Sequence, residues 1–561
     1  MPARTEPFND PNLTIVSIED FTPGIFTFSR GNYPQVVTPR APIGSASAIG
    51  TYRCYAIANY GLVPFPTYRT LINSSVSLPN GGSESIAAMY PLASNPSGLV
   101  PDAIVYATNT VTPGSPPTTG FAVRWIPATS LPSSSTLFYS NSGSNLGSDH
   151  LFFAAGVFIP PFSPPTISNP TRSVAIVDPT TGTMTWVTAP AWNGTNTTGT
   201  ITSPGVWNTT AHVFFVNNRM CFEMISNEAL LYSNQQAASG IFSSDLNAMN
   251  NFSGPNLFYP EMGIGIGTWG SISDGEFFFV YQGGGGVLVY GDLAFPTSAV
   301  KLPGLAGTGN ADGPGVETSV GLVYVTDFDG AYVWNGGNTS TKISQAISDD
   351  VLFRGSPLPA PFSNTARASA HNDVWSNWVM FANNWMWDVL TGSWWKVEDP
   401  AVNTMMMHCP SLVTTGVFYS SDWMAVNNTG STGPVTVHIF VWDRTIPATT
   451  YRWTSNPISP IPGRLFSLEW VEIVATNPTA TGSATVTVTP IGDANTLGNN
   501  TQHVAFTVPP NVQSWRGSMR LGFSGYNMQI QVDSVGAGSN PAPSIHEIHL
   551  GFVPTRTSQV E

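Results

Sequence analysis

Short runs of apolar and aromatic residues recur along the whole chain, and turn-forming residues separate them. The runs are four to eight residues long, as in Glu276–Tyr281 (EFFFVY) and Val287–Tyr290 (VLVY). Runs of this length that are rich in Val, Ile, Phe, Tyr and Trp indicate β-strands. The chain of 561 residues contains 53 glycines and 48 prolines, which punctuate these runs. The sequence therefore predicts a nearly all-β protein. A single segment, Lys342–Phe353 (KISQAISDDVLF), has apolar residues at helical spacing, and we expect a short helix there.

The connections between the runs are short and rich in glycine, which favours antiparallel hairpins over crossover helices. In Gln282–Gly286 (QGGGG), glycine accepts the positive φ that tight hairpin turns require. Three further hairpins share one pattern: an apolar strand, a turn with an acidic residue or Asn and a Gly, and a returning strand with Trp. They are SVAIVDPTTGTMTWV over Ser173–Val187, LVYVTDFDGAYVW over Leu322–Trp334 and WVMFANNWMWDVLTGSWWKV over Trp378–Val397.

The repetition of these Trp-bearing hairpins predicts a β-propeller. A four-stranded unit cannot bury both of its faces alone, so similar units stack and large rings fill the space between neighbours. The spacing is irregular and there is no repeated WD or kelch signature, so stacked sandwiches are the alternative. The N-terminal part also contains strand candidates. A strand donated by this segment would close the ring and remove an exposed sheet edge.

The pattern changes after about Thr454. A Pro-rich linker, Ser455–Pro462 (SNPISPIP), is followed by six alternating strands, which is typical of a small β-sandwich. We therefore expect an N-terminal β segment over 1–100, a β-propeller over 101–454 and a C-terminal β-sandwich over 455–561. The six expected strands are Leu465–Val474, Ser483–Pro490, Val504–Val508, Met519–Phe523, Met528–Val532 and Ile545–Phe552.

Composition excludes several classes of protein. The net charge is −14 and charged residues make up 9% of the chain, against roughly 25% in an ordinary globular protein. No window is basic, so the electrostatic signature of a nucleic-acid binder is missing. No apolar run approaches the about 20 residues of a membrane helix, and the polar N-terminus does not resemble a secretory signal. The cysteines Cys54, Cys221 and Cys409 are too widely spaced to predict a disulfide framework or a zinc site.

Motifs that carry chemistry are also missing from the sequence. We find no nucleophile elbow, P-loop or zinc-protease signature, so we expect no catalytic, cofactor-binding or metal-binding residues and no enzymatic activity. His546 and His549 (HEIH) are three residues apart on an expected strand, where alternation sends them to opposite faces and away from a shared metal. Met405–Cys409 (MMMHC) is expected in a buried strand or loop rather than around a metal ion.

A glycosidase is the most specific enzymatic alternative. Asp178–Trp186 approaches the S-x-D-x-G-x-T-W hairpin motif of sialidases, but inserted residues change its spacing. The arginine cluster and the paired acids of those enzymes have no matching positions. Whether two of the scattered acidic residues form a catalytic carboxylate pair stays open at this point. The acids concerned are Glu223, Glu228, Asp274, Glu276, Asp292, Glu398 and Asp399.

The segment Val323–Ile343 (VYVTDFDGAYVWNGGNTSTKI) resembles blade segments in the β-propeller tail proteins of tailed bacteriophages. The layout is similar too, since Asp20–Ile25 (DFTPGI) opens the chain and a sandwich ends near Glu547–Thr555 (EIHLGFVPT). The resemblance covers about residues 15–555 in layout but only short motifs in sequence. In short-tailed phages, proteins of this kind form the tail nozzle, a ring of identical subunits at the distal tail.

The resemblance implies a structural protein of the virion tail. Its expected role is a nozzle, tip or adaptor ring that forms part of the conduit for genome ejection into the host. Its expected partners are identical subunits in a hexameric ring, neighbouring tail proteins, DNA that passes through the lumen without specific binding, and a host surface glycan. The alternative function is a carbohydrate-binding or glycan-cleaving β-propeller protein, secreted or virion-borne.

Overall fold

The computed structural model is built almost entirely of β-strands, as the sequence predicts. The residues that the structure describes are 13–25, 44, 46, 50–76, 83–92, 103–112, 118–127, 136–142, 152–154, 157–159, 173–177, 184–188, 207–216, 219–226, 238–243, 246, 257–258, 265–273, 276–293, 295–309, 313–326, 330–347, 371–373, 378–381, 385–396, 404–409, 422–427, 435–458, 460, 465–492, 502–525, 528–555.

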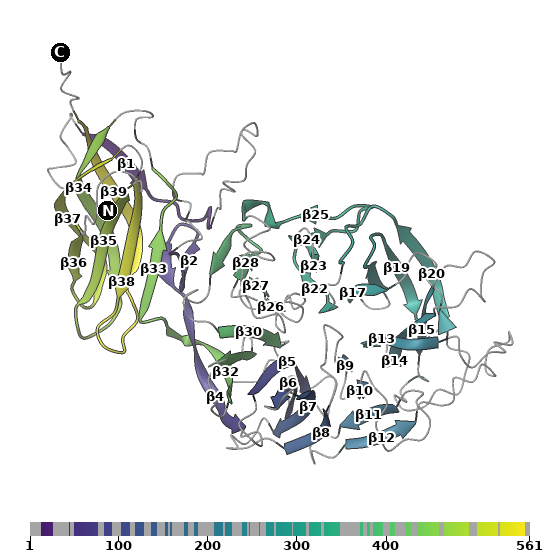
Figure 1. Cartoon of the computed structure of the whole chain (residues 1–561). Helices are drawn as coiled ribbons and strands as arrows, with labels where there is room; N and C mark the ends of the chain where they lie inside the picture. The colour runs from purple at the N-terminus through teal and green to yellow at the C-terminus, as the bar shows by residue number, and fades with distance from the viewer. Residues whose placement is uncertain are drawn as a thin grey trace.

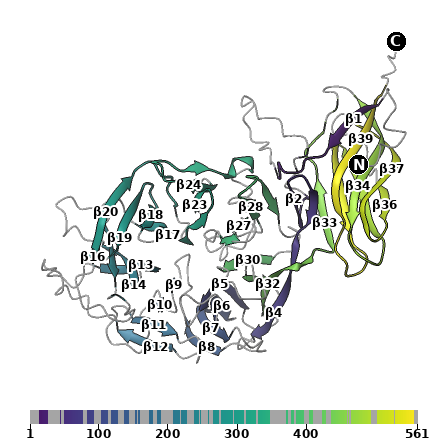
Figure 2. The same ribbon diagram turned by 180° about the vertical axis from the view of Figure 1, so that it is seen from behind.

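Seven sheets of the described part stand around a ring, and each is a blade of a β-propeller (Figures 1 and 2). Six blades follow one another along the chain, from β5 to β29. The seventh combines β30, β31 and β32 with the N-terminal strand β4, which pairs antiparallel with β32. The ring is therefore closed by strands from both ends of the propeller segment.

The blades have the following strands. They are β5 (Ser83–Leu92), β6 (Ala103–Thr112), β7 (Thr118–Pro127) and β8 (Thr136–Ser142); β9 (Phe152–Ala154), β10 (Val157–Ile159), β11 (Ser173–Val177) and β12 (Met184–Thr188); β13 (Trp207–Val216), β14 (Arg219–Ser226), β15 (Ala238–Ser243) and β16 (Leu257–Phe258); β17 (Ile266–Ser273), β18 (Glu276–Tyr281), β19 (Gly286–Asp292), β20 (Phe295–Leu302) and β21 (Gly313–Pro314); β22 (Val316–Thr318), β23 (Gly321–Thr326), β24 (Gly330–Trp334) and β25 (Thr341–Lys342); β26 (His371–Asp373), β27 (Trp378–Phe381), β28 (Trp385–Asp388) and β29 (Trp394–Lys396); β30 (Thr404–Cys409), β31 (Asp422–Asn427), β32 (Val435–Pro447) and β4 (Pro66–Val76).

The three Trp-bearing hairpins are confirmed as antiparallel pairs: β11 with β12, β23 with β24, and β28 with β29. In the second and third hairpins, the Trp rings contact the neighbouring blade as expected. Trp334 of β24 stacks on Phe278 of the preceding blade, with 4.4 Å between ring centroids. The indole N–H of Trp394 donates to the carbonyl oxygen of Ile343 in the neighbouring blade at 2.9 Å. Large aromatic side chains therefore fill the space that two twisted sheets leave between them.

The short helix expected over Lys342–Phe353 is wrong for the residues that the structure describes, which end at Ile347. Lys342 lies in β25 and pairs with Tyr332, and only a 3₁₀ turn, η3 (Ser344–Ala346), follows. The Ser344 hydroxyl accepts a hydrogen bond from the backbone N–H of Ala331 at 3.1 Å. Pairing with the blade therefore overrides the local helical spacing. Residues 348–353 lie outside the described part of the chain.

A β-sandwich of two sheets lies beside the ring (Figure 1). The first sheet has the order β2-β3-β39-β34-β37, with β1 also paired to β39, and the second has the order β33-β38-β35-β36. The six strands expected after residue 454 are all present. The sandwich strands are β1 (Thr14–Ile18), β2 (Cys54–Ile57), β3 (Gly61–Pro64), β33 (Thr450–Thr454), β34 (Phe466–Asn477), β35 (Ala484–Gly492), β36 (Val504–Val508), β37 (Val512–Gly525), β38 (Met528–Val535) and β39 (Ser544–Pro554).

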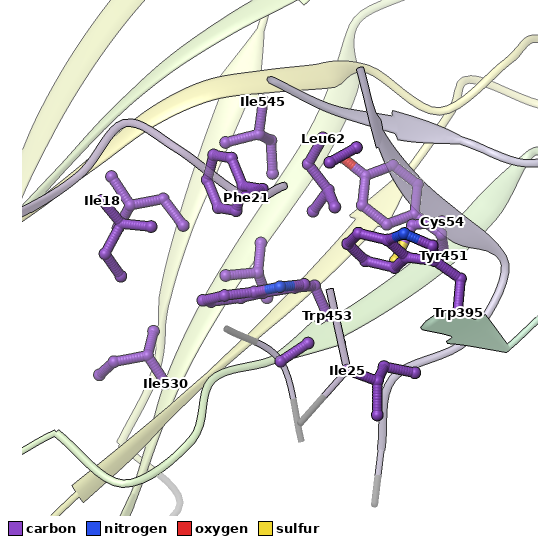
Figure 3. Packing of buried hydrophobic residues seen from close by; sticks show 14 of the residues in the cluster. Ile18, Phe21, Ile25, Cys54, Leu62, Trp395, Tyr451, Trp453, Ile530 and Ile545 are labelled. Atoms are coloured by element: carbon purple, nitrogen blue, oxygen red, sulfur yellow. The ribbon is translucent and has the colours of Figure 1, made fainter. Parts of the chain in front are cut away.

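N-terminal residues join the sandwich to the ring. Strands β1, β2 and β3 belong to the first sandwich sheet although they come from the expected N-terminal segment, and β33 precedes the expected boundary at 454. Figure 3 shows Phe21 above Trp453, and the two rings meet edge to face with centroids 5.4 Å apart. The N–H of Ile25 donates to the carbonyl oxygen of Trp394 in β29 at 2.8 Å. One buried cluster therefore runs from the sandwich into the propeller.

Candidate functional site

The first sandwich sheet has an unusual outer face, which is the side turned away from the second sheet. Along β34, Val471 and Ile473 point into the core, whereas the alternate residues Trp470, Glu472 and Val474 lie on the outer face. The strand register places the neighbours of these residues in three rows. The rows are Arg520, Trp470, Gly551 and Ile15; Ser518, Glu472, His549 and Ser17; and Arg516, Val474 and Glu547.

The part of the outer face around Glu472 and Arg516 is a buried charged network. Glu472 is fully buried, and the Arg516 side chain is 7% exposed. Nη1 of Arg516 donates to Oε1 of Glu472 at 2.5 Å, and Nη2 donates to Oε2 of Glu547 at 3.1 Å. The guanidinium thus lies between two carboxylates from different strands. Because an unpaired buried charge is very unfavourable, this arrangement is what permits Glu472 on a covered surface.

A histidine extends the network to the N-terminal strand. Nε2 of His549 lies 3.0 Å from Oε2 of Glu547 and 4.0 Å from Oε1 of Glu472. On the other side of the ring, Nδ1 lies within hydrogen-bond distance of the Ser17 hydroxyl, at 2.9 Å. Ser17 belongs to β1, so the network connects four strands, β1, β39, β34 and β37.

The part of the outer face around Trp470 and Arg520 is accessible. Trp470 is half-buried, and its neighbour Gly551 has no side chain to cover the ring. The Arg520 side chain is 73% exposed, and its Nε and Nη2 donate to Oε2 of Glu469 at 3.3 and 3.1 Å. The Ser467 hydroxyl donates to the other carboxylate oxygen of Glu469 at 2.7 Å. In the pairing of β34 with β39, the register shift between Leu468 and Trp470 makes Glu469 the extra residue of a bulge, and Glu469 bonds Arg520 of β37 on the other side.

This accessible part of the outer face combines an aromatic ring with oriented polar groups. An indole offers an apolar face with a large contact area, and a charged pair offers directional donors and acceptors. A saccharide presents the complementary chemistry, because its ring has an apolar C–H face and a rim of hydroxyls. We call Trp470, Glu469 and Arg520 the aromatic corner of the outer face.

The histidine pair of the sequence analysis lies on this same sheet, but strict alternation is wrong there. The register of β39 shifts beside Val474, and His546 is the extra residue of a second bulge. As a result Ile545 and Ile548, three residues apart, are both buried in the core. A spacing of three therefore does not send His546 and His549 to opposite faces.

The two histidines nevertheless have separate partners. Nε2 of His546 lies 2.6 Å from the Thr476 hydroxyl, and its Nδ1 bonds the carbonyl oxygen of Tyr60. His549 makes the contacts with Ser17 and Glu547 given above. Within the described ranges, no group of three His, Cys, Asp or Glu side chains is placed to hold a metal ion.

Of the candidate acids, the structure describes the side chains of Asp292 and Glu276. Asp292 forms an ion pair with the buried Arg219, with 2.8 Å between Oδ2 and Nη2, which joins two neighbouring blades. Asp388, an acid outside that set at the end of β28, accepts a hydrogen bond at its Oδ1 from the N–H of Leu390, and burial raises the pKa of Asp388. Glu276 is half-buried at the start of β18. The side chains of Asp178, Glu223, Glu228, Asp274, Glu398, Asp399 and Met405–Cys409 lie outside the described residues.

Sequence reasoning missed the network and the aromatic corner. The signal was present, because Phe466–Val474 (FSLEWVEIV) and Ile545–Leu550 (IHEIHL) place charged or imidazole groups inside otherwise apolar strands of a weakly charged chain. The partner Arg516 is 44 residues from Glu472 in the sequence, however, and only the strand order brings them together.

No family model and no curated protein matches this sequence. Solved structures do match. The enzymatically active domain of tailspike protein 4 from bacteriophage CBA120 aligns over 26% of this chain and 18% of that chain, at 12% identity and a TM-score of 0.14. A family 43 glycoside hydrolase, an arabinoxylan arabinofuranohydrolase from Bacillus subtilis, aligns over 84% of this chain and 96% of that chain, at 11% identity and a TM-score of 0.23. The Trypanosoma rangeli sialidase aligns over 87% of this chain and 96% of that chain, at 8% identity and a TM-score of 0.32.

These matches correct one prediction. The sequence predicted a protein without enzymatic activity, whereas each of the three structures is an enzyme or an enzymatically active domain, so that prediction is contradicted. At these identities and TM-scores, the matches assign no reaction to this chain. In the part that the structure describes, no helix has the length and apolar character needed to span a membrane.

Proposed function

We propose that this protein is a carbohydrate-active β-propeller protein, and that the aromatic corner of its sandwich binds the glycan. The observation that supports the proposal is the accessible Trp470 beside the hydrogen-bonded pair of Arg520 and Glu469. The buried charged network lies on the same face of the sheet and links the strands that carry these side chains. The corner is therefore positioned by rigid strands rather than by a loop.

Binding to polysaccharides tests this proposal directly. The full chain is run through native gels that contain dextran, arabinoxylan or galactomannan, and the retardation gives an affinity for each polymer. Replacing Trp470 by Ala removes the ring, and we expect affinity for the bound polymer to fall at least about tenfold, which corresponds to about 1.4 kcal/mol. Replacing Trp470 by Phe keeps an aromatic face and should retain most of the affinity.

A matched control separates binding from general surface effects. Ile491 in β35 is 37% exposed and lies on the other sheet of the sandwich. Ile491→Ala should leave retardation unchanged. The release of reducing sugar from the same polymers is measured in parallel, because it reports cleavage. Unchanged affinity in Trp470→Ala would contradict the assignment of the aromatic corner.

A place in a virion tail is the second candidate function. Val320 lies in the turn between β22 and β23, and Leu390 lies in the turn between β28 and β29, with 44% and 73% of their surfaces exposed. In an antiparallel meander the first and third turns lie at the same end of the sheet. Apolar side chains of two neighbouring blades are therefore exposed at one end, and a second copy in a ring of identical subunits would cover them.

Light scattering on the purified chain tests this second candidate. A ring requires a mass that is a multiple of 59.8 kDa, and a double replacement of Val320 and Leu390 by Asp should reduce it to the monomer. A wild-type monomer at all concentrations would contradict the ring. The nozzle position, passage of DNA and contact with other tail proteins belong to this candidate, and images of virions labelled with an antibody against the chain test the location.

A further inference from the structure

We infer that the aromatic corner selects uncharged saccharides over acidic ones; this inference rests on the proposed function and adds the chemical class of the glycan. It is carried by the way in which the charges of the outer face are paired. Both guanidinium groups of the outer face, those of Arg516 and Arg520, are bound to carboxylates.

The accessible cation is already neutralised. Two nitrogen atoms of Arg520 donate to one carboxylate oxygen of Glu469, and the Ser467 hydroxyl holds the other oxygen. An acidic sugar that approached Arg520 would have to compete with this carboxylate for the same donors. An uncharged sugar, in contrast, places a hydroxyl beside the pair and accepts from or donates to it without breaking it.

The surrounding charge acts in the same direction. The outer face carries two guanidinium groups and three carboxylates, those of Glu469, Glu472 and Glu547, which sum to one negative charge when His549 is neutral. The whole chain has a net charge of −14. Repulsion therefore lowers both the affinity and the association rate of a polyanion, and it does not act on an uncharged polymer.

A variant shifts the selectivity toward acidic polymers without altering the ring. Glu469→Gln keeps a side-chain oxygen that can accept from Ser467 but removes the negative charge, so the guanidinium of Arg520 becomes available to an anion. We expect the ratio of the affinity for polygalacturonate to the affinity for the uncharged polymer to rise at least about threefold. The fold should survive, because an exposed ion pair contributes little to stability.

A second ion pair provides the matched control. On the other sheet, Nε of Arg452 donates to Oδ1 of Asp533, with side chains 35% and 27% exposed. Asp533→Asn removes one negative charge from the chain, as Glu469→Gln does, but far from the aromatic corner in the fold. This control should change neither affinity. An equal gain for polygalacturonate in both variants would show a nonspecific charge effect and would overturn the inference.

The experiment compares wild type and both variants on dextran, arabinoxylan and galactomannan as uncharged polymers and on polygalacturonate and polysialic acid as acidic ones. Tighter binding of wild type to an uncharged polymer than to either acidic polymer supports the inference. Binding to an acidic polymer at least as tight as to every uncharged one overturns it and leaves the proposed function standing. Binding to no polymer contradicts the proposed function itself, and the inference falls with it.

Discussion

The two faces of the first sandwich sheet are built from the same strands but stabilised by different interactions. The inner face is apolar, with Val471, Ile473 and Ile548 fully buried against the second sheet. The outer face is accessible at the aromatic corner, yet its buried residues include Glu472 and His549. Both faces thus contain fully buried residues, while the chemistry of those residues is opposite.

The difference shows how burial and polarity can be separated in a β-sheet. On the inner face each side chain contributes by leaving water, and its neighbours need only fill space. On the outer face each charged group depends on particular partners at hydrogen-bond distance, because desolvation of a charge is offset only by good geometry. The outer face should therefore tolerate single changes less well than the inner face does.

The largest expected effect is at Arg516. Arg516→Met leaves the buried Glu472 without its cation, and we expect the free energy of unfolding to fall by about 3–5 kcal/mol. Chemical denaturation monitored by tryptophan fluorescence measures the change. The double variant Arg516→Met with Glu472→Gln removes the unpaired negative charge. It should recover at least half of the lost free energy of unfolding. A double variant no more stable than the single one would contradict the expectation that the outer face depends on paired charges.

A smaller effect is expected on the inner face at Ile548. Ile548→Val deletes one buried methylene, and we expect a loss of about 0.5–1.5 kcal/mol from reduced burial and a small cavity. The same denaturation experiment measures it. Because no partner is left unpaired, a compensating second substitution is not needed. A loss as large as that of Arg516→Met would mean that the two faces are equally sensitive.

The exposed ion pair of the aromatic corner should matter less still for stability. Arg520→Ala removes a pair whose cation is 73% exposed, and we expect a loss of about 0.2–1 kcal/mol that shrinks as salt is added. Unfolding curves at low and high salt measure both the size and the salt dependence. A salt-independent loss would indicate that the arginine acts through packing of its aliphatic stem.

The smallest effect is expected for the thiols. Cys54 in β2 and Cys221 in β14 are fully buried, and burial raises the pKa of both, that of Cys221 to about 12. The thiolate is the reactive form, so neither should be alkylated by iodoacetamide in the native protein at pH 8. Peptide mass spectrometry after alkylation, with and without denaturant, measures this. Native labelling of Cys54 would show that the sandwich opens around β2.

Much of the fold was predictable because strand and turn preferences are local. Alternation in Phe466–Val474, the glycines of Gln282–Gly286 and the tryptophans of the blade hairpins each identify an element from a few neighbouring residues. Prediction failed where pairing with another strand decides the outcome. Lys342 extends a blade instead of starting a helix, and the bulge at His546 changes which residues share a face.

The candidate site was not predictable in the same way. Its members are polar or aromatic residues of ordinary strands, and no motif spacing connects Arg516 to Glu472 or Glu469 to Arg520. Each pair forms because β37 lies beside β34, and the network reaches Ser17 because β1 is the neighbour of β39.

The sequence by itself determined that the chain is built from β-strands, where the hairpins turn, and which rings pack between blades, since these follow from side-chain period and backbone preference over a few residues. Only the tertiary structure decided that β4 closes the ring, that β1 joins the sandwich, and that buried charges find partners on one side of a sheet. Those outcomes depend on strand order and register, and contacts between residues far apart in the sequence leave no local pattern.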